Sequence, residues 1–527
     1  MLLTDLVTTS ATVAATSSRL AKRRALAELL RRCSADEVVI AVAYLAGETR
    51  QRRTGIGWRS VATPPPPAGQ ATLTLAAVDE TLETISQLAG SGSQAARTAA
   101  IEALLATATA AEQELLRRLL TGELRQGALD ALVLDALAEA VEVPTADVRR
   151  AAMLLGSSAA AARRAVTEGR PGLLAARLEV GRPVRPMLAA SAGDVDTALR
   201  SMAPAGGLVI ADAKLDGIRI QIHRDGDRVL VVTRTLDDIT DRLPEVVEQV
   251  RALPAARLVL DGEAIALRAD GRPHPFQVTA ARTASRADVS ALRSRTPVST
   301  FLFDVLHLDG RDLLSEPLMT RAQLLAELVP GDLAVPRLHT DQASAVAAFF
   351  DEVVAAGHEG LVIKSPHAVY DAGRRGAGWV KVKPRHTFDL VVLAAEWGHG
   401  RRTGRLSNLH LGARADAAHS PAGPSDFVML GKTFKGLTDQ LLEWQTAQLL
   451  ARETGRSGNV VHVRPELVVE VAFDGVQRSR RYPGGVALRF ARVLRYRDDK
   501  PVAEAETLGA LRALLPDDAP LTAPAQR

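Results

Sequence analysis

The chain has 527 residues, a formal net charge of +4 and a pI of about 9.3. At roughly 100–200 residues per domain, this length predicts three or four domains. The hydrophobic fraction is 47% and the aromatic fraction only 3%, so we expect several cores built mainly from Ala, Leu and Val. The single cysteine, Cys33, excludes both an internal disulfide framework and a zinc site made of four cysteines.

The sequence contains no apolar run of about 18 residues, and therefore no predicted membrane span. In the first 24 residues the apolar positions are interrupted and the basic cluster comes late, which is unlike a secretory signal. We therefore expect a cytoplasmic protein. The basic balance suits an anionic partner such as nucleic acid, but many ordinary enzymes share it.

Residues 1–175 are predicted to form an all-α domain. Leu26, Leu29 and Leu30 share one helical face, and long Ala/Leu/Glu/Arg segments follow at helical spacing. The segment TPPPPAG at 63–69 interrupts the helices and predicts an exposed extended turn. Residues 176–194 are interpreted as a linker.

Residues 195–385 are predicted to form a mixed α/β domain. The segment 207–234 alternates apolar and polar residues around Asp225-Gly226, which predicts a β-hairpin. Further short strands alternate with helical segments such as PEVVEQVRAL.

Residues 386–505 are predicted to form a small β-domain, followed by a C-terminal tail at 506–527. Five strands joined by Gly-rich turns, with one inserted helix at 438–453, fit a barrel of the OB type. The segment 415–426 is predicted to be a hairpin loop.

The tetrapeptide Lys214-Leu215-Asp216-Gly217 is the centre of the predicted chemistry. A lysine at a strand end, followed by a turn glycine, can present its amine to a cleft. To act as a nucleophile it must lose its proton, which burial or a nearby cation favours. Taken alone, the tetrapeptide is weak evidence, because it occurs by chance in many proteins and more often marks an exposed strand-end lysine.

Other motifs follow the tetrapeptide in a fixed order over about 290 residues. Together they resemble the motif set of the covalent nucleotidyltransferase superfamily, and in particular the ATP-dependent DNA ligases. After Lys214 the motif positions are Arg219, Arg234 in TRTLDD, Glu263 in LDGE, Phe303 in FLFDVLHLDG, Glu359 in EGLVIK, Arg375, Lys381 and Lys383 in WVKVK, and the run from Leu488 to Lys500.

The resemblance implies a multidomain enzyme with a helical DNA-binding domain, an adenylation domain and an OB-fold domain. Lys214 is implied to carry AMP, and Glu263 and Glu359 to hold Mg²⁺ or Mn²⁺ through oxygen ligands. Phe303 is implied to stack on adenine, with a core aromatic as the alternative. The implied ATP-binding residues are Asp212, Arg219, Arg234, Glu263, Phe303, Arg375, Lys381 and Lys383. Asp212, two positions before the lysine, is implied to read the adenine amino group, and many family members have Glu there.

Two further segments carry the resemblance beyond the central motifs. Arg489, Arg492, Arg497 and Lys500 are implied to orient pyrophosphate in the first step. The turn LTGELRQG resembles the Gly-x-Leu-Arg-x-Gly turn of the helical DNA-binding domain, and its implied DNA-binding residues are Gly122, Leu124, Arg125 and Gly127.

The resemblance implies that ATP is the cosubstrate and that a monomer binds nicked duplex DNA, in a bacterial cytoplasm near the nucleoid. A replicative and a repair role stay open, as do clamp or repair partners. A single cysteine excludes the zinc module of NAD-dependent ligases. The alternatives are a GTP-using capping enzyme, an RNA ligase, and a non-catalytic DNA-binding protein on a ligase scaffold.

Overall fold

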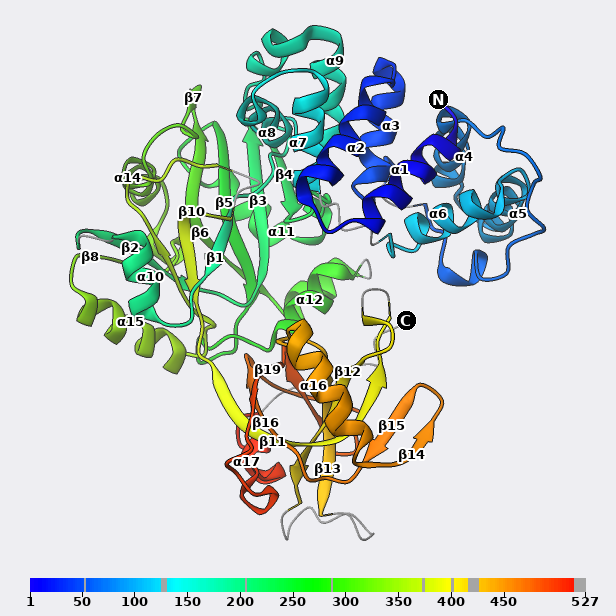
Figure 1. Ribbon diagram of the computed structural model, residues 1–527. Helices are drawn as coiled ribbons and strands as arrows, with labels where there is room; N and C mark the ends of the chain where they lie inside the picture. The colour runs from blue at the N-terminus through cyan, green and yellow to red at the C-terminus, as the bar shows by residue number, and fades with distance from the viewer. Residues whose placement is uncertain are drawn as a thin grey trace.

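The computed structural model describes residues 1–51, 54–124, 130–203, 206–285, 288–371, 375–399, 402–415 and 426–515. Figure 1 shows three regions in chain order: a helical region in blue and cyan, a central α/β region in green, and a strand-rich region in yellow to red. Among the described residues, no helix is both long and apolar enough to cross a membrane.

The N-terminal region is helical, as predicted. Polar caps fix several of its helix starts: Ser34 and Glu37 form a reciprocal capping box at α3, and Thr109 and Glu112 form another at α6. Its helices are α1 Leu3–Ala15, α2 Arg19–Arg31, α3 Ala35–Leu45, η1 Trp58–Ser60, α4 Leu75–Gln87, α5 Ser93–Ala106, α6 Ala110–Leu120, α7 Asp130–Ala140, α8 Thr145–Leu154 and α9 Ser158–Leu174.

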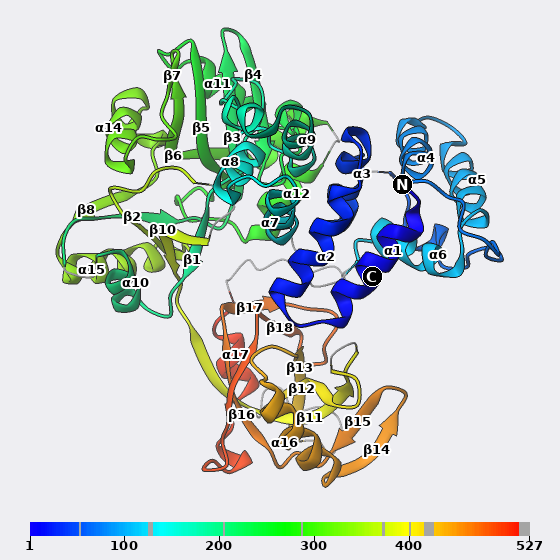
Figure 2. The ribbon, with the colours of Figure 1, turned by 45° about the horizontal axis from the view of Figure 1, so that its top comes forward.

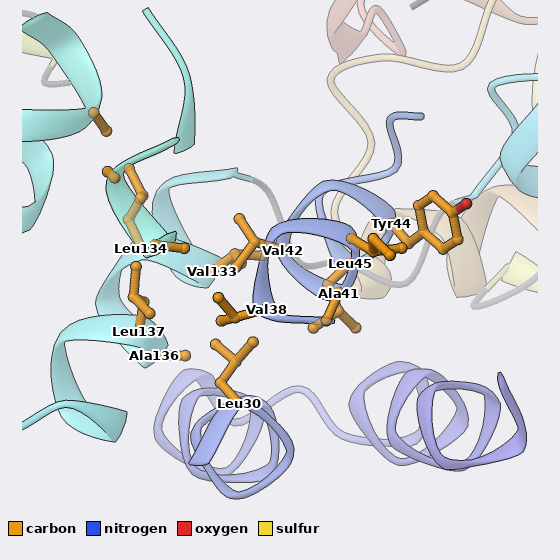
Figure 3. Close-up of a cluster of buried hydrophobic side chains, with 14 of the residues drawn as sticks. Leu30, Val38, Ala41, Val42, Tyr44, Leu45, Val133, Leu134, Ala136 and Leu137 are labelled. Carbon is orange, nitrogen blue, oxygen red and sulfur yellow. The ribbon is translucent and has the colours of Figure 1, made fainter. Parts of the chain in front are cut away.

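The apolar faces of these helices meet in one core. Leu30 of α2, Val38 and Val42 of α3, and Val133 and Leu137 of α7 point toward one another in Figure 3, and all are at most 2% exposed. The same cluster of buried side chains continues through Val184 and Met187 to Val259 and Leu306 of the central region. The helical region is therefore packed against the central region and not merely tethered to it.

The central region contains two five-stranded sheets. Their orders are β1-β10-β9-β2-β8 and β4-β3-β5-β6-β7. The strands of the first sheet are β1 Leu188–Ser191, β2 Val209–Lys214, β8 Arg337–Thr340, β9 Gly360–Lys364 and β10 Arg375–Val382. Those of the second are β3 Ile218–Asp225, β4 Arg228–Thr233, β5 Arg257–Ala266, β6 Val298–Leu308 and β7 Arg311–Asp312.

The helices of the central region are α10 Val195–Met202, η2 Thr240–Arg242, α11 Pro244–Arg251, α12 Phe276–Ala284, α13 Val289–Arg295, α14 Leu318–Leu328, η3 Gly331–Leu333 and α15 Ala343–Ala355. Of these, α10, α14 and α15 lie on the outer sides of the sheets in both ribbon views (Figures 1 and 2). The predicted hairpin is β3–β4, with Gly226 at φ +60° in its turn. Residues 188–191, which the sequence analysis placed in the linker, form β1, because β10 offers them a parallel pairing edge.

The C-terminal region is rich in strands, and β11 carries the chain into it from β10 (Figure 1). Its seven-stranded sheet comprises β11 His386–Trp397, β12 Leu406–Arg414, β13 Phe427–Thr433, β14 Glu453–Ser457, β15 Val460–Val463, β16 Val468–Phe473 and β19 Arg492–Tyr496. A separate hairpin pairs β17 Gly475–Arg478 with β18 Val486–Arg489. The remaining elements are α16 Asp439–Leu450, η5 Val502–Glu504 and α17 Leu508–Arg512.

The expectation of five strands in this region was wrong, because more strands pair. The GRS and VVHV segments on either side of Gly458 form the hairpin β14–β15, which the sequence analysis did not identify. The inserted helix is confirmed as α16. The predicted hairpin loop at 415–426 lies, except for its end residues, outside the described part of the chain.

Candidate active site

A pocket of about 930 Å³ lies between the two central sheets and has the size of a nucleotide site. The first sheet lines it with residues of β2, β9 and β10, and the second with residues of β3, β5 and β6. Of the predicted site residues, the lining includes Asp212, Lys214, Arg219, Arg234, Glu263, Phe303 and Lys381.

Lys214 is the last residue of β2, and a tight turn then leads into β3. This turn needs a glycine at 217, because an added Cβ would lie 2.5 Å from the carbonyl oxygen of Ala264 on β5. The Lys214 side chain is 23% exposed, and its Nζ lies 2.5 Å from an Oε atom of Glu359. The strand-end lysine is therefore held in the pocket by a carboxylate.

Glu359 joins two lysines. Its second carboxylate oxygen accepts a hydrogen bond of 2.8 Å from Lys383 Nζ, and its backbone N–H donates to the carbonyl oxygen of Lys214 at 2.9 Å. Burial acts to raise the pKa of Glu359, but the charges of Lys214 and Lys383 outweigh burial and lower it to about 2. This carboxylate is therefore ionised at neutral pH.

Glu263 lies opposite Arg219 in the β3–β5 ladder and faces the same pocket. Burial raises the pKa of Glu263 to about 7, against the opposing charges of Lys214 and Arg219. Within the described residues no hydrogen bond or ion pair engages its carboxylate. A half-buried carboxylate with open acceptor positions fits a cation that prefers oxygen ligands, although no group of three or more metal-ligating side chains is assembled among the described residues.

Arg219 is tied to the protein on several sides. Its guanidinium donates two hydrogen bonds to Asp261, at 2.9 and 2.5 Å, and one of 2.7 Å to the carbonyl oxygen of Met187. Tyr370 also donates to Asp261, at 2.7 Å. Arg219 is thus a fixed cation at the pocket wall, which suits an anionic ligand because no ordering is needed on binding.

An aromatic pair forms the other end of the pocket. Phe303 of β6 and Trp379 of β10 lie edge to face, with ring centroids 6.1 Å apart. Lys364 Nζ lies 4.2 Å from the Trp379 ring centroid and 5.0 Å from that of Phe303. Phe303 is half-buried and lines the pocket, so its ring is accessible to a flat ligand.

Asp212 lies at this aromatic end and is 2% exposed. Arg337 donates to both of its carboxylate oxygens, at 2.6 and 2.9 Å, and Lys364 forms a second ion pair with it. Burial acts to raise the pKa of Asp212, but these two cations outweigh burial and lower it. The predicted adenine-reading residue is therefore already engaged by two cations.

Two of the remaining predicted cations occupy other positions around the pocket. Arg234 is exposed in the turn after β4, and Lys381 lines the pocket from β10. Burial, together with the nearby charges of Lys383 and Lys214, lowers the pKa of Lys381. Arg375 begins β10, but its side chain lies outside the described part of the structure.

The predicted pyrophosphate cluster divides into two parts. Arg489, at the end of β18, donates to Asp216 across the boundary between the regions at 3.2 Å, and so reaches the turn beside Lys214. Arg497 and Lys500 instead donate to Asp389 of β11, at 2.9 and 2.8 Å. Arg492 is exposed on β19.

Two more contacts hold the C-terminal region against the lysine end of the pocket: Lys383 lies 3.5 Å from Asp474, and Gln277 lies 3.4 Å from Gln477.

The predicted DNA-binding turn is only partly described. Gly122 follows α6 with φ +70° and is exposed, and Leu124 is half-buried. Arg125 and Gly127 lie outside the described residues.

Sequence reasoning missed one pocket-lining residue, Lys364, and several residues that contact the lining from behind. Asp261 stands in the quoted LDGE motif and Lys364 ends EGLVIK, so alternation along their strands could have placed both near the site. Arg337 and Tyr370 have no local signal, because they reach the site only through the pairing of β8 with β2 and through the packing of a loop.

Comparisons with known proteins identify relatives of this chain. The chain matches the family models "DNA ligase N terminus" over residues 59–138, "ATP dependent DNA ligase domain" over 186–383 and "ATP dependent DNA ligase C terminal region" over 402–500. Proteins named probable DNA ligase from Beutenbergia cavernae and a Nocardioides species are each 58% identical to it, over 98% of this chain and 99% of theirs. A third, from Mycobacterium marinum, is 55% identical over 98% of this chain and 100% of its own.

A solved structure named Pmar-Lig_PreS3 has a similar fold, with a TM-score of 0.59 and 18% identity over 93% of this chain and 99% of that one. Three family models match in chain order, and relatives above 50% identity align over nearly the whole length. The chain therefore belongs to the ATP-dependent DNA ligase family.

Proposed function

We propose that this enzyme seals nicks in duplex DNA through a lysine–AMP intermediate on Lys214, in replication, repair or recombination. The observation that carries the proposal is the position of Lys214 at a strand end inside a nucleotide-sized pocket, 2.5 Å from Glu359 and beside the cations Lys381 and Lys383. Such a site offers a nucleophile and fixed charges for phosphates together.

In the first step, the neutral Lys214 amine attacks the α-phosphorus of ATP. A nitrogen–phosphorus bond forms, the bond to the pyrophosphate oxygen breaks, and the lysine proton passes to solvent. Lys381, which lines the pocket, and Lys383, which shares Glu359 with Lys214, would balance charge on the phosphates. Arg219 lies 5.3 Å from the Phe303 ring centroid, at the base end of the pocket. Phe303 offers a ring face to adenine, and Asp212 an acceptor to its amino group.

In the second step, a 5′-phosphate oxygen at the nick attacks the AMP phosphorus, and the bond to Lys214 breaks as the amine regains a proton. In the third, the 3′-hydroxyl attacks the 5′-phosphorus, forms the phosphodiester bond and releases AMP, and its proton passes to solvent. All three steps are phosphoryl transfers, in which positioning and charge neutralisation supply most of the rate.

We assign Glu263 and Glu359 as the residues that would hold Mg²⁺ or Mn²⁺. Glu263 supports this role because its side chain is half-buried in the pocket wall, and its carboxylate has no hydrogen bond or ion pair among the described residues. The ion would supply neutralising charge at the phosphates.

We infer that the strand-rich C-terminal region is an OB-fold domain, and that the domains span 1–175, 195–385 and 386–505. The hairpin β17–β18 brings Arg489 to Asp216, which supports a role for this domain in the first step. A monomer that wraps the duplex would use all three domains, with the helical domain holding phosphates through the Gly122–Gly127 turn.

The function is tested by incubating the full-length protein with nicked duplex DNA and ATP, GTP or NAD in parallel. We expect sealing with ATP but not with GTP or NAD. We also expect a radiolabelled protein band when the ATP carries the label at its α-phosphate. Sealing that depends on GTP or NAD, or no labelled band, would reject the proposal.

The DNA-binding role of the helices has a separate test. Removing residues 1–175 should spare self-adenylation but weaken nick binding and flatten its salt dependence, because fewer counterions are released. Equal nick affinity for both proteins across a salt titration would show that the helices serve another purpose.

A further inference from the structure

Two buried charges at the aromatic end of the pocket, and a half-buried arginine behind them, bear on how the base is recognised. Asp212, Lys364 and Arg337 lie on the adjacent strands β2, β9 and β8. Asp212 is directly opposite Arg337 in the β2–β8 ladder, so the sheet itself fixes this pair. Both Asp212 and Lys364 line the pocket at 2% exposure, whereas Arg337 stands behind Asp212 and outside the pocket lining.

The hydrogen-bond geometry leaves Asp212 with little spare capacity. A carboxylate has about four acceptor positions. One oxygen accepts from Arg337 Nε at 2.6 Å, and the other accepts from Arg337 Nη2 at 2.9 Å and pairs with Lys364. Three positions are thus filled, and one remains on the oxygen that faces only Arg337 Nε.

Arg337 is itself fixed. Its Nη2 donates a further hydrogen bond of 2.7 Å to the carbonyl oxygen of Phe303, the residue whose ring lines the pocket. The Arg337 guanidinium therefore links two groups by hydrogen bonds. One is the Asp212 carboxylate, the expected acceptor for the base edge, and the other is Phe303, whose ring is expected to stack on the base. Lysine could not replace Arg337 fully, because an ammonium group cannot donate the same pair of coplanar hydrogen bonds to a carboxylate.

The remaining acceptor position discriminates between purines. At the same place adenine presents an amino group, which donates, and guanine presents a carbonyl oxygen, which accepts. A carboxylate kept ionised has no proton to donate, so it pairs with adenine and repels guanine. A buried carboxylate without its cations would instead take up a proton and could donate to guanine.

We propose that Arg337 is the positioning residue that sets the preference for ATP over GTP, by holding Asp212 as a charged acceptor with one open position for the base. This inference rests on the proposed function, since it assumes that adenine lies at the aromatic end of the pocket. Arg337 acts through Asp212 and does not contact the nucleotide.

The test measures labelling of the full-length protein by α-labelled ATP and GTP over a range of concentrations. Wild type should favour ATP by about 10³-fold or more. Arg337→Met should raise the KM for ATP about 10–100-fold and lower the ATP/GTP ratio of kcat/KM at least about tenfold, with kcat for ATP within about threefold. Arg337→Lys should recover part of the ratio.

Two further variants distinguish this role from a general loss of structure. Asp212→Asn keeps the shape but removes the charge, so it should also narrow the ATP/GTP ratio. Arg293→Met removes an equally bidentate pair, with Glu248, outside the pocket lining, and should leave both KM and the ratio unchanged.

The outcomes separate the two proposals. No labelling of wild type by either nucleotide would reject the proposed function. Labelled wild type with an unchanged ATP/GTP ratio in Arg337→Lys and Asp212→Asn would overturn the inference alone, whether or not Arg337→Met folds. Equal loss of kcat for both nucleotides with no change in the ratio would likewise show that Arg337 serves stability only.

Discussion

The two ends of the pocket are built in different ways. At the aromatic end, Asp212 forms ion pairs with both Arg337 and Lys364, which lie on neighbouring strands of the same sheet. At the lysine end, the charges come from both sheets and from the C-terminal region, and Glu263 has no partner among the described residues. The charged side chains of the aromatic end are therefore already fixed before any ligand binds, while the lysine end contains charges that a polyphosphate and a cation would satisfy.

We therefore expect the aromatic end to contribute mainly to ligand binding and the lysine end mainly to the reaction. A preorganised end can select and hold a ligand without rearranging, whereas an end with open charges and a contact between domains is where bonds and domain positions can change. Substitutions at the lysine end should lower rates, and those at the aromatic end should weaken or misdirect binding.

The largest effect is expected at Lys214. Lys214→Ala removes the proposed nucleophile and should reduce labelling by α-labelled ATP to background, because no other side chain takes over the bond to phosphorus. Its thermal midpoint should stay within a few degrees of wild type, since the side chain is partly exposed. Labelling of this variant at the wild-type level would end the argument for a lysine–AMP intermediate.

Glu359→Gln should have the next largest effect. The substitution keeps the shape but leaves Lys214 and Lys383 without their shared counter-charge. We expect the single-turnover rate of labelling at saturating ATP to fall about 10²–10³-fold, as for other losses of charge stabilisation at a reacting centre. Glu248→Gln, at an exposed ion pair outside the pocket, is the matched control. A rate within threefold of wild type would remove Glu359 from the chemistry.

The C-terminal cations should give a step-specific effect. Arg497 and Lys500 pair with Asp389 in this structure, so they must leave that carboxylate to reach pyrophosphate. Changing both to Ala should slow lysine adenylation at least about tenfold, because positioned cations stabilise a leaving group. Sealing of nicks that already carry the 5′-adenylate should stay near the wild-type rate. Equal loss in both assays would show that the assignment to the first step is wrong.

The smallest effect is expected from the pH dependence of stability through His223 on β3, where Gly181 of the linker contacts this strand. His223 is 1% exposed; its Nδ1 accepts from the Gly181 N–H and its Nε2 donates to Gln221. Burial, with a smaller contribution from His307, lowers the pKa of His223 to about 4, so the unfolded chain binds a proton first as the pH falls. Stability from the neutral ring is complete above about pH 6.5 and is lost toward pH 4.

This linkage should cost about 2–3 kcal/mol of unfolding free energy between pH 7 and 4.5. Urea titrations at both pH values measure it, and His223→Gln should show a smaller decrease over the same interval. If both proteins lose the same stability, other groups carry the acid sensitivity.

The sequence alone determined the order of the regions and much of the lysine end. Amphipathic spacing predicted the helical N-terminal region, and alternation around Asp225-Gly226 predicted the β3–β4 hairpin, because both patterns depend on neighbours in the chain. The family was identifiable because Lys214, Glu263 and Glu359 stand in short motifs with a fixed order.

Only the tertiary structure decided which charges meet. The pairing of β2 with β8 brings Arg337 to Asp212 across 125 positions of sequence, and the β17–β18 hairpin brings Arg489 to Asp216 across 273. It also divided the C-terminal cations, turning Arg497 and Lys500 toward Asp389. Strand register and domain packing set these contacts, and neither leaves a local signal in the sequence, because each depends on the whole arrangement of sheets.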